Sequence, residues 1–416
     1  MALLLILLLL AAPAAARVVH TDRPPTTPAP APRPGDDRAS PAIDLTGLAS
    51  TWCGTPRTVD EYRSNPTNLP HVKVVYAHPS DVPDRFAAYA DLIQRSVRAA
   101  SQAVVDASTR RRALRFDVGT ACGTSRLDVL VVHLPRPRAY YAADDPERPT
   151  TRLGADVRRL LRAPGDLTRN LLLFADSMRV PNGPGGWAES DSDPRAGPTN
   201  DTNFGNTAAG IYGIGASSFV ENEPYLVQAI LHELMHLMGA VPPGAPNATA
   251  GTHCRDEWDV MCYADAPGVT LDFRCPGDYY TLRLDCGGDD YFHPAPPPNS
   301  PLRRRWNAFS SYFLCAAGTC HRPVAVGRLR ASATRAALTV RYRVPQSLPV
   351  SYALERRTAR GRWVRLGSRF NHEAVAGENV ARARRRLVPG RHRVRAITGE
   401  EGAGQPRPAV AEFTVR

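Results

Sequence analysis

The chain has 416 residues, enough for two or three domains that each bury a hydrophobic core. Its formal net charge is +12, and apart from Lys73 every one of its 52 Lys and Arg residues is Arg. No stretch beyond the N-terminus approaches the length that crosses a bilayer, which excludes a protein with helical membrane spans. We therefore expect no membrane span, and we expect no specific nucleic-acid partner.

The N-terminal residues predict an export signal. Residues 1–16 are almost wholly apolar and end in three alanines, a pattern typical of a secretory signal peptide, although no Lys or Arg precedes the apolar run. We expect a secreted, extracellular protein. Residues 17–45 are rich in Pro, Thr, Ala and Asp without a hydrophobic period, which predicts a disordered linker.

Eight cysteines in an exported chain favour disulfide bonds. The easiest pairs to predict are Cys53 with Cys122 and Cys315 with Cys320. The other four allow three pairings, which the sequence does not separate. A cysteine-ligated zinc site is the alternative, but the chain has no C-x-x-C spacing. The four cysteines whose pairing stays open are Cys254, Cys262, Cys275 and Cys286.

Residues 46–321 alternate strand and helix patterns, which predicts a domain of the α/β or α+β class. A Gly-, Pro- and Asp-rich stretch, Gly183–Asn206, is predicted to be a long surface loop. Trp306, Phe309, Tyr312 and Phe313 recur at helical spacing and predict a core-packing helix. The predicted strands are His71–Ala77, Leu114–Val118, Leu127–Leu134, Asn170–Ala175 and Ile211–Ile214, and the predicted helices are Phe86–Ser108 and Leu153–Leu161.

The most informative stretch is Ala229–Gly239, which has the sequence AILHELMHLMG. As a helix that begins near Pro224, it places His232 and His236 one turn apart on a single face, with Glu233 beside them. Two imidazoles at this spacing can bind one Zn²⁺, and the neighbouring carboxylate can act as a general base on a water that the metal activates. Satisfied histidines on a buried helix are the alternative. Against it, Glu233 would be an uncompensated charge on such a helix.

A catalytic zinc needs a third protein ligand, and His253 is the first candidate because it lies between the helix and a compact turn. Asp256, Glu257 and Asp259 remain open as carboxylate alternatives. For Asp259 we favour a hydrogen bond that orients a ligand histidine. For the other two acids we favour turn capping and solvation.

In these residues the chain resembles the metzincin zinc peptidases, which carry His-Glu-x-x-His-x-x-Gly, a third ligand beyond the Gly and a methionine turn below the metal. Three residues past the Gly, where that family has His or Asp, this chain has Pro242. The resemblance therefore places the third ligand later, across an insertion. The matching residues are His232, Glu233, His236 and Gly239, with Met261 as the methionine of the turn.

The resemblance implies a mixed sheet over an active-site helix, with a cleft between two subdomains. It also implies a zinc endopeptidase with protein or peptide substrates, in which Glu233 is the base. Tyr263, two residues after Met261, matches a tyrosine that in some metzincins helps to stabilise the transition state. The alternative function is a secreted adhesion protein whose zincin-like domain is a scaffold and whose C-terminal domain binds polyanions.

A second acidic cluster, Asp285–Tyr291, has the Gly and carboxylates of a turn that could hold Ca²⁺, although it lacks the twelve-residue calcium loop with its terminal Glu. A plain turn anchored by a disulfide is the alternative for this segment.

Residues 322–416 differ in pattern and charge from the rest of the chain. They hold 21 Arg and 6 Glu, a balance of +15, so the preceding residues sum to −3. Short alternating segments between Gly and Pro turns predict a β-sandwich of the immunoglobulin or fibronectin type. Its basic surface is either simply solvated or a binding site for an anionic cell-surface polymer. The predicted strands are Val324–Ala331, Ala337–Val344, Val350–Arg357, Trp363–Arg369, His392–Ile397 and Ala409–Val415.

Overall fold

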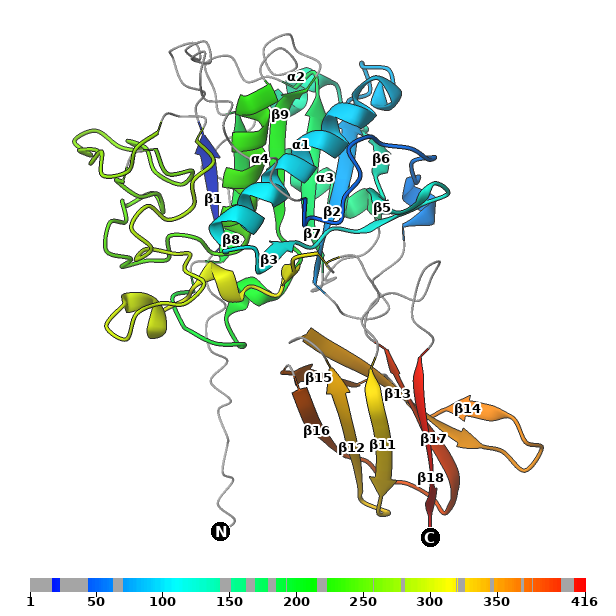
Figure 1. The fold of residues 1–416 in the computed structure, drawn as a ribbon. Helices are drawn as coiled ribbons and strands as arrows, with labels where there is room; N and C mark the ends of the chain where they lie inside the picture. Colours follow the sequence, from blue (N-terminus) through cyan, green and yellow to red (C-terminus); the bar gives the residue numbers. More distant parts are fainter. Residues whose placement is uncertain are drawn as a thin grey trace, which may run out of the picture.

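The computed structural model describes most of the chain as a mixed α/β part followed by an all-β part (Figure 1). The predicted signal peptide and Glu257 lie outside the described residues. The described residues are 17–22, 44–62, 70–142, 151–161, 169–178, 185–191, 193–214, 223–256, 258–277, 281–318, 320, 326–344, 348–367, 370–375, 377–397 and 408–416.

A six-stranded sheet with the order β1-β8-β9-β7-β2-β6 forms the centre of the α/β part. The strands β6, β2, β7 and β9 run parallel, whereas β8 and β1 are antiparallel to their neighbours. The strands predicted at the positions of β2, β7 and β9 are confirmed. The bounds are β1 Arg17–Asp22, β2 His71–His78, β6 Leu130–His133, β7 Arg169–Asp176, β8 Gly186–Asp191 and β9 Ala208–Ile214.

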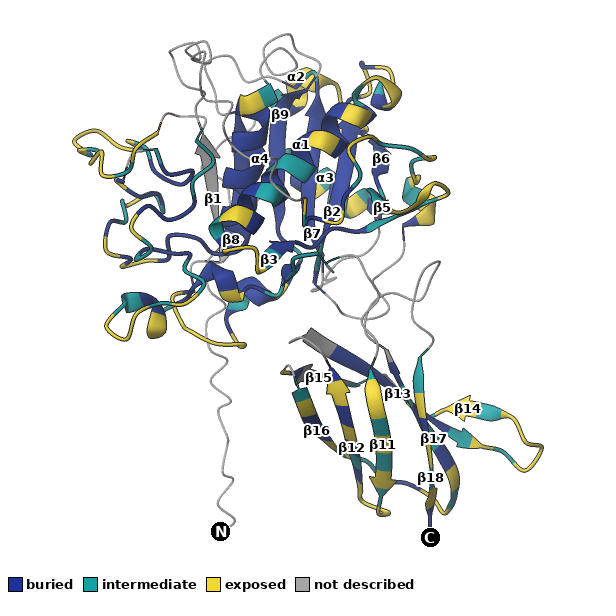
Figure 2. Cartoon of the chain, viewed as in Figure 1, coloured by how far each residue is buried: buried dark blue, intermediate teal, exposed yellow. Residues whose placement is uncertain are grey.

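Helices cover both faces of this sheet, which explains why its central strands are nearly continuously apolar (Figure 2). Val74 and Tyr76 of β2 point to one core, shared with α1 and α4, while Val75 and Ala77 point to the other, shared with α3. The helices are α1 Phe86–Ala107, α2 Arg138–Ala142, α3 Arg152–Leu161 and α4 Glu223–Leu237.

The prediction of a surface loop over Gly183–Asn206 is wrong for its first half, because Gly186–Asp191 forms the strand β8. The second half contains a 3₁₀ turn at Asp201–Asn203. The strand is buried, but it carries an acid, Glu189, which is fully buried against the guanidinium of Arg158 on α3. This ion pair explains why β8 lacks the apolar pattern of a core strand.

The prediction of a linker over residues 17–45 is wrong at its start. Arg17–Asp22 forms β1, which pairs antiparallel with β8 so that Arg17 lies opposite Asp191 and Asp22 opposite Gly186. The segment contains the β-branched residues Val18, Val19 and Thr21, which favour extended backbone, and it pairs with the outer edge of β8.

Smaller elements differ from their predicted bounds. The strand predicted over Leu114–Val118 is split into β3, Arg112–Leu114, and β4, Val118–Thr120; the one over Leu127–Leu134 is split into β5, Gly123–Leu127, and β6. The strand β3 pairs with β10, Leu314–Ala316.

The helix predicted from Trp306 to Phe313 is wrong, because the segment forms a single 3₁₀ turn at Ala308–Ser310. The Asn307 side chain accepts a hydrogen bond from Phe309 N, and the Ser311 hydroxyl accepts one from Phe313 N. These local side-chain bonds compete with helical backbone bonds.

Four disulfide bonds include all eight cysteines. The two predicted pairs are confirmed, and the open four pair as Cys254–Cys262 and Cys275–Cys286. The alternative of a cysteine-ligated zinc site is therefore wrong.

Two sheets form the all-β part, one with the order β11-β12-β16 and one with β14-β13-β17-β18, where β15 also pairs with β13. Side chains from both sheets, including Tyr342 and Tyr352 with ring centroids 5.7 Å apart, share one core. Two of these strands, β15 and β16, were not predicted. The bounds are β11 Gly327–Ala333, β12 Ala337–Val344, β13 Leu348–Arg357, β14 Trp363–Arg365, β15 Phe370–Ala374, β16 Gly377–Arg384, β17 Gly390–Ile397 and β18 Ala409–Val415.

Among all the described helices, none combines the length and the apolar character needed to cross a membrane.

Candidate metal centre

The helix α4 is buried over nearly its whole length between α1 and the sheet. It ends at Leu237, two residues before Gly239, whose φ of +70° permits a left-handed turn; Ala240 N donates to Met235 O and Gly239 N donates to His236 O. A side chain at 239 would also overlap Thr202. This termination sends the chain sharply away from the helix directly after the second histidine.

Three imidazoles converge at this end of the helix. His232 Nε2 lies 2.9 Å from His236 Nε2, and His236 Nε2 lies 3.1 Å from His253 Nε2. All three side chains are buried. The structure thus brings the predicted third residue, His253, to the helix pair across the insertion that follows Pro242.

Contacts at Nδ1, the ring nitrogen that faces away from the other histidines, fix the orientation of two of these rings. His232 Nδ1 lies 2.5 Å from the Val260 carbonyl oxygen, and His253 Nδ1 lies 3.0 Å from an oxygen of Asp265. A carbonyl oxygen can only accept, so His232 Nδ1 carries its proton, and the carboxylate favours the same tautomer in His253. Their Nε2 atoms therefore present lone pairs to the common centre.

This donor set fits a zinc ion. Nitrogen ligands at about 2.0–2.1 Å from a tetrahedral Zn²⁺ lie about 3.3 Å apart, close to the two separations between the histidine nitrogens. Lone pairs that face one another across such distances repel unless a cation lies between them. The three histidines therefore form a group that could hold a metal ion.

Asp265 was not singled out in the sequence, although it completes the setting of His253. Burial alone would raise the pKa of this carboxyl, but hydrogen bonds from His253 and Thr249 lower it below its usual value. An ionised Asp265 holds the ring through Nδ1. Asp265 thus orients a ligand histidine, the role that the sequence suggested for Asp259. In the structure Asp259 accepts hydrogen bonds from other groups.

Asp259 organises the methionine turn rather than a histidine. One of its oxygens accepts hydrogen bonds from Met261 N, at 2.7 Å, and from the Tyr291 hydroxyl, while the other accepts from Cys286 N. Burial raises its pKa to about 7 despite these bonds. Met261 itself is fully buried, and its carbonyl oxygen accepts from Cys254 N beside His253.

Glu233 is fully buried and packs against β8. A Cβ placed on Gly186 would overlap the Glu233 carboxylate, so only glycine leaves room for it. Gly186 was not predicted as a site residue, because its contact with Glu233 arises only when β8 joins the sheet. The carboxylate that the sequence marks as a base is therefore positioned by a strand that the sequence did not show.

Tyr263 lies beside the histidines, with its ring centroid 4.3 Å from that of His253 and 5.9 Å from that of His232. Asp256 lies away from this group and joins Asp289 and Asp290 instead. The structure therefore gives no support to Asp256 as a third ligand, and the alternative Glu257 lies outside the described residues.

Comparison with known proteins assigns no family. No protein-family model matches the chain, and no curated protein matches it. Among solved structures, OgpA from Akkermansia muciniphila is 12% identical with a TM-score of 0.28, covering 89% of this chain and 97% of that chain. A β-glucosidase from Listeria innocua is 10% identical with a TM-score of 0.18, covering 96% of this chain and 48% of that chain. Similarities at this level carry no argument about function.

Proposed function

We propose that this protein is a secreted zinc-dependent endopeptidase that hydrolyses protein or peptide substrates. The observation that carries the proposal is the convergence of three histidine Nε2 atoms beside a buried glutamate on one helix. His232, His236 and His253 would hold the ion, leaving the fourth tetrahedral position open. When bound, Zn²⁺ supplies Lewis acidity that polarises a substrate carbonyl and lowers the pKa of a water molecule.

Glu233 is the proposed general base. A carboxylate next to the first histidine can take a proton from the attacking water and return it to the leaving amine after the C–N bond breaks. Its fixed position against Gly186 supports this role, because a base that is already placed loses no freedom on reaching the transition state. Tyr263 is proposed to donate a hydrogen bond to the oxyanion that forms on the substrate carbonyl.

Export is part of the proposal. Four disulfide bonds are typical of chains that mature in an oxidising compartment, which agrees with the signal peptide expected at residues 1–16.

Zinc content and turnover test the proposal together. We expect about one zinc per chain by elemental analysis, and cleavage of casein that falls by about 10²–10⁴-fold in Glu233→Gln while zinc is retained. Glu223→Gln is the matched control, because Glu223 lies on the same helix in an exposed ion pair with Arg95. Bound zinc without cleavage of a broad peptide library would refute the endopeptidase.

Two further outcomes are informative. Unchanged zinc content and activity in His253→Ala would overturn only the third-ligand assignment. Zinc binding without turnover, together with binding of anionic polymers that is lost on deleting residues 322–416, would favour the alternative function of a secreted adhesion protein.

A further inference from the structure

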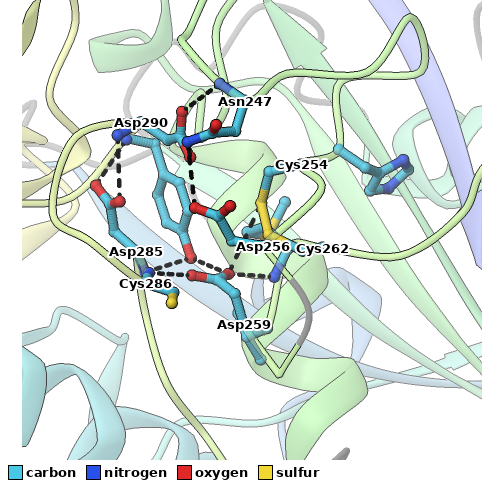
Figure 3. The surroundings of a disulfide bond; sticks show 12 residues. Asn247, Cys254, Asp256, Asp259, Cys262, Asp285, Cys286 and Asp290 are labelled. Carbon is cyan, nitrogen blue, oxygen red and sulfur yellow. Dashed lines mark hydrogen bonds between the residues drawn. A yellow bond between two sulfur atoms is a disulfide. The ribbon is translucent and has the colours of Figure 1, made fainter. Parts of the chain in front are cut away.

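A second group of ligating oxygens lies behind the candidate metal centre. Carboxylate oxygens of Asp256, Asp289 and Asp290 all lie within 4.8 Å of one another. Asp256 comes from the loop between His253 and Met261, whereas the other two come from the acidic turn after Cys286 (Figure 3 shows Asp256 and Asp290). Asp256 is 1% exposed and Asp290 is 2% exposed, so two of the three carboxylates are removed from bulk water.

The protein's own donors satisfy only part of this group. Asn247 Nδ2 donates to one oxygen of Asp256 at 3.2 Å and to one oxygen of Asp290 at 3.0 Å, and Asn247 N donates to the other oxygen of Asp290 at 2.8 Å (Figure 3). Among the described residues, the buried atoms Asp256 Oδ1 and Asp289 Oδ1 have no hydrogen-bond partner. Arg274 forms an ion pair with this group: its Nε lies 3.7 Å from Asp256 Oδ1, and its side chain is half exposed.

Such an arrangement is costly without a cation. Burial, followed by the charge of Asp290, raises the pKa of Asp256 to about 6, and burial likewise raises the pKa of Asp290. A buried carboxylate oxygen without a donor loses its hydration and gains no hydrogen bond in return. Because Asp256 Oδ1 is buried without a hydrogen-bond donor and the three carboxylates lie within 4.8 Å of one another, a cation bound among them would compensate all three charges.

We propose that Asp256, Asp289 and Asp290 bind one Ca²⁺. Calcium takes six to eight oxygen ligands at 2.3–2.6 Å, so three carboxylate oxygens that lie within 4.8 Å of one another can all reach one ion. Carboxylate oxygens suit this hard cation, whereas Mg²⁺ demands a stricter and smaller octahedron.

The proposal moves the calcium site that the sequence suggested within Asp285–Tyr291. Both carboxylate oxygens of Asp285 accept hydrogen bonds from backbone N–H groups, those of residues 289 to 292. It shapes the turn and directs no free oxygen to an ion. The ligands are instead the two acids that follow, together with Asp256, which the sequence placed among solvated turn residues.

The site has a structural consequence. It joins the loop that carries His253 and Met261 to the acidic turn, at a point between the disulfides Cys254–Cys262 and Cys275–Cys286. Calcium would thus stabilise the loop that supplies the third histidine.

Calorimetric titration of the full-length, zinc-loaded protein with CaCl₂ tests the site without relying on peptidase activity. We expect one Ca²⁺ per chain, at least about tenfold weaker binding in Asp256→Asn and in Asp289→Asn, and a rise in melting temperature with Ca²⁺ in the parent protein alone. Asp272→Asn is the matched control, since this acid is half exposed and pairs with Arg274 nearby.

Several outcomes would overturn the assignment. They are no calcium binding, equal binding in Asp289→Asn, or tighter binding of Mg²⁺ than of Ca²⁺ in the same titration. If Asp256→Asn fails to fold, Asp289→Asn decides the question, because the Asp289 side chain is only half buried.

Discussion

Asp265 fixes the ring of His253 from the side opposite the candidate metal position. Replacing it with Ala removes the acceptor that selects the Nε2 lone pair, so we expect zinc affinity to fall by about 10–100-fold. Competition between the purified protein and a zinc chelator of known affinity measures the change. Asp265→Asn keeps a neutral acceptor and should lose less.

The control for Asp265 is Asp201→Asn, a partly exposed acid in an ion pair with Arg195. Equal zinc affinity in Asp265→Ala and in this control would show that His253 is oriented by other contacts, or that it is not a ligand.

A substitution at Gly186 can separate an effect on catalysis from an effect on metal binding. In Gly186→Ala the new methyl group would displace the Glu233 carboxylate, while the three histidines stay in place. We expect kcat/KM on a peptide substrate to fall by roughly 10²-fold with unchanged zinc content. Gly327→Ala, where a Cβ meets only an ordinary contact, should leave both quantities unchanged.

Among the residues of the candidate site, those that could be predicted are the ones whose spacing along the chain already indicates their role. His232, Glu233 and His236 follow from one helical turn, and His253 follows from its place before the methionine turn. Asp265 and Gly186 had no local signal, because each acquires its role from a contact across the fold.

Among the elements, β8 connects the N-terminal strand β1 with the helix α4, which carries the proposed base. Its first residue, Gly186, packs on Glu233, and its outer edge is paired with β1 along the full length of Arg17–Asp22. The backbone groups that β1 occupies are those with which an extended peptide could pair by strand addition. The first strand therefore blocks an edge that leads directly to the proposed base.

Deleting residues 17–22 should open that edge. If the proposed peptidase binds substrate there, kcat/KM for an extended peptide should rise by roughly tenfold, equivalent to about 1.4 kcal/mol of competition removed. Deletion of residues 30–35 removes the same number of residues from the predicted linker and serves as control. An unchanged or lower kcat/KM in the first deletion alone would mean that β1 stabilises the fold rather than occupying a substrate site.

The elements that the sequence predicted share one property, a simple apolar pattern. The parallel strands β2 and β7 are buried on both faces and have apolar centres, interrupted in β2 by the buried Lys73, and α1 has a clear amphipathic period. In β8 the buried charge of Glu189 is paired with Arg158, which is distant in sequence, so the local pattern resembled a loop. Buried ion pairs and edge pairing are therefore the features that single-chain periodicity misses.

At the scale of the whole molecule, charge divides the chain. Residues 322–416 carry a balance of +15 and the preceding residues −3. Part of this charge lines a surface groove of about 680 Å³ that includes Arg335 and Arg384–Arg386. Several Arg residues gathered around one groove raise the local potential more than the same charges spread over a surface.

The groove gives the basic domain a specific test. Replacing Arg384, Arg385 and Arg386 together with Gln should weaken binding to heparin, used as a model polyanion, and lower the salt concentration needed for elution. The control replaces Arg360, Arg362 and Arg365, which are exposed on the same domain but outside the groove, with Gln. Both variants lose three charges, so a loss of net charge alone predicts an equal decrease in the salt concentration that elutes each of them from heparin.

We expect the groove variant to elute at a lower salt concentration than the control, because its three charges act on one bound segment of the polymer. Equal decreases in the elution salt would mean that heparin responds to the net charge of the domain alone, and that the groove is not a specific polyanion site.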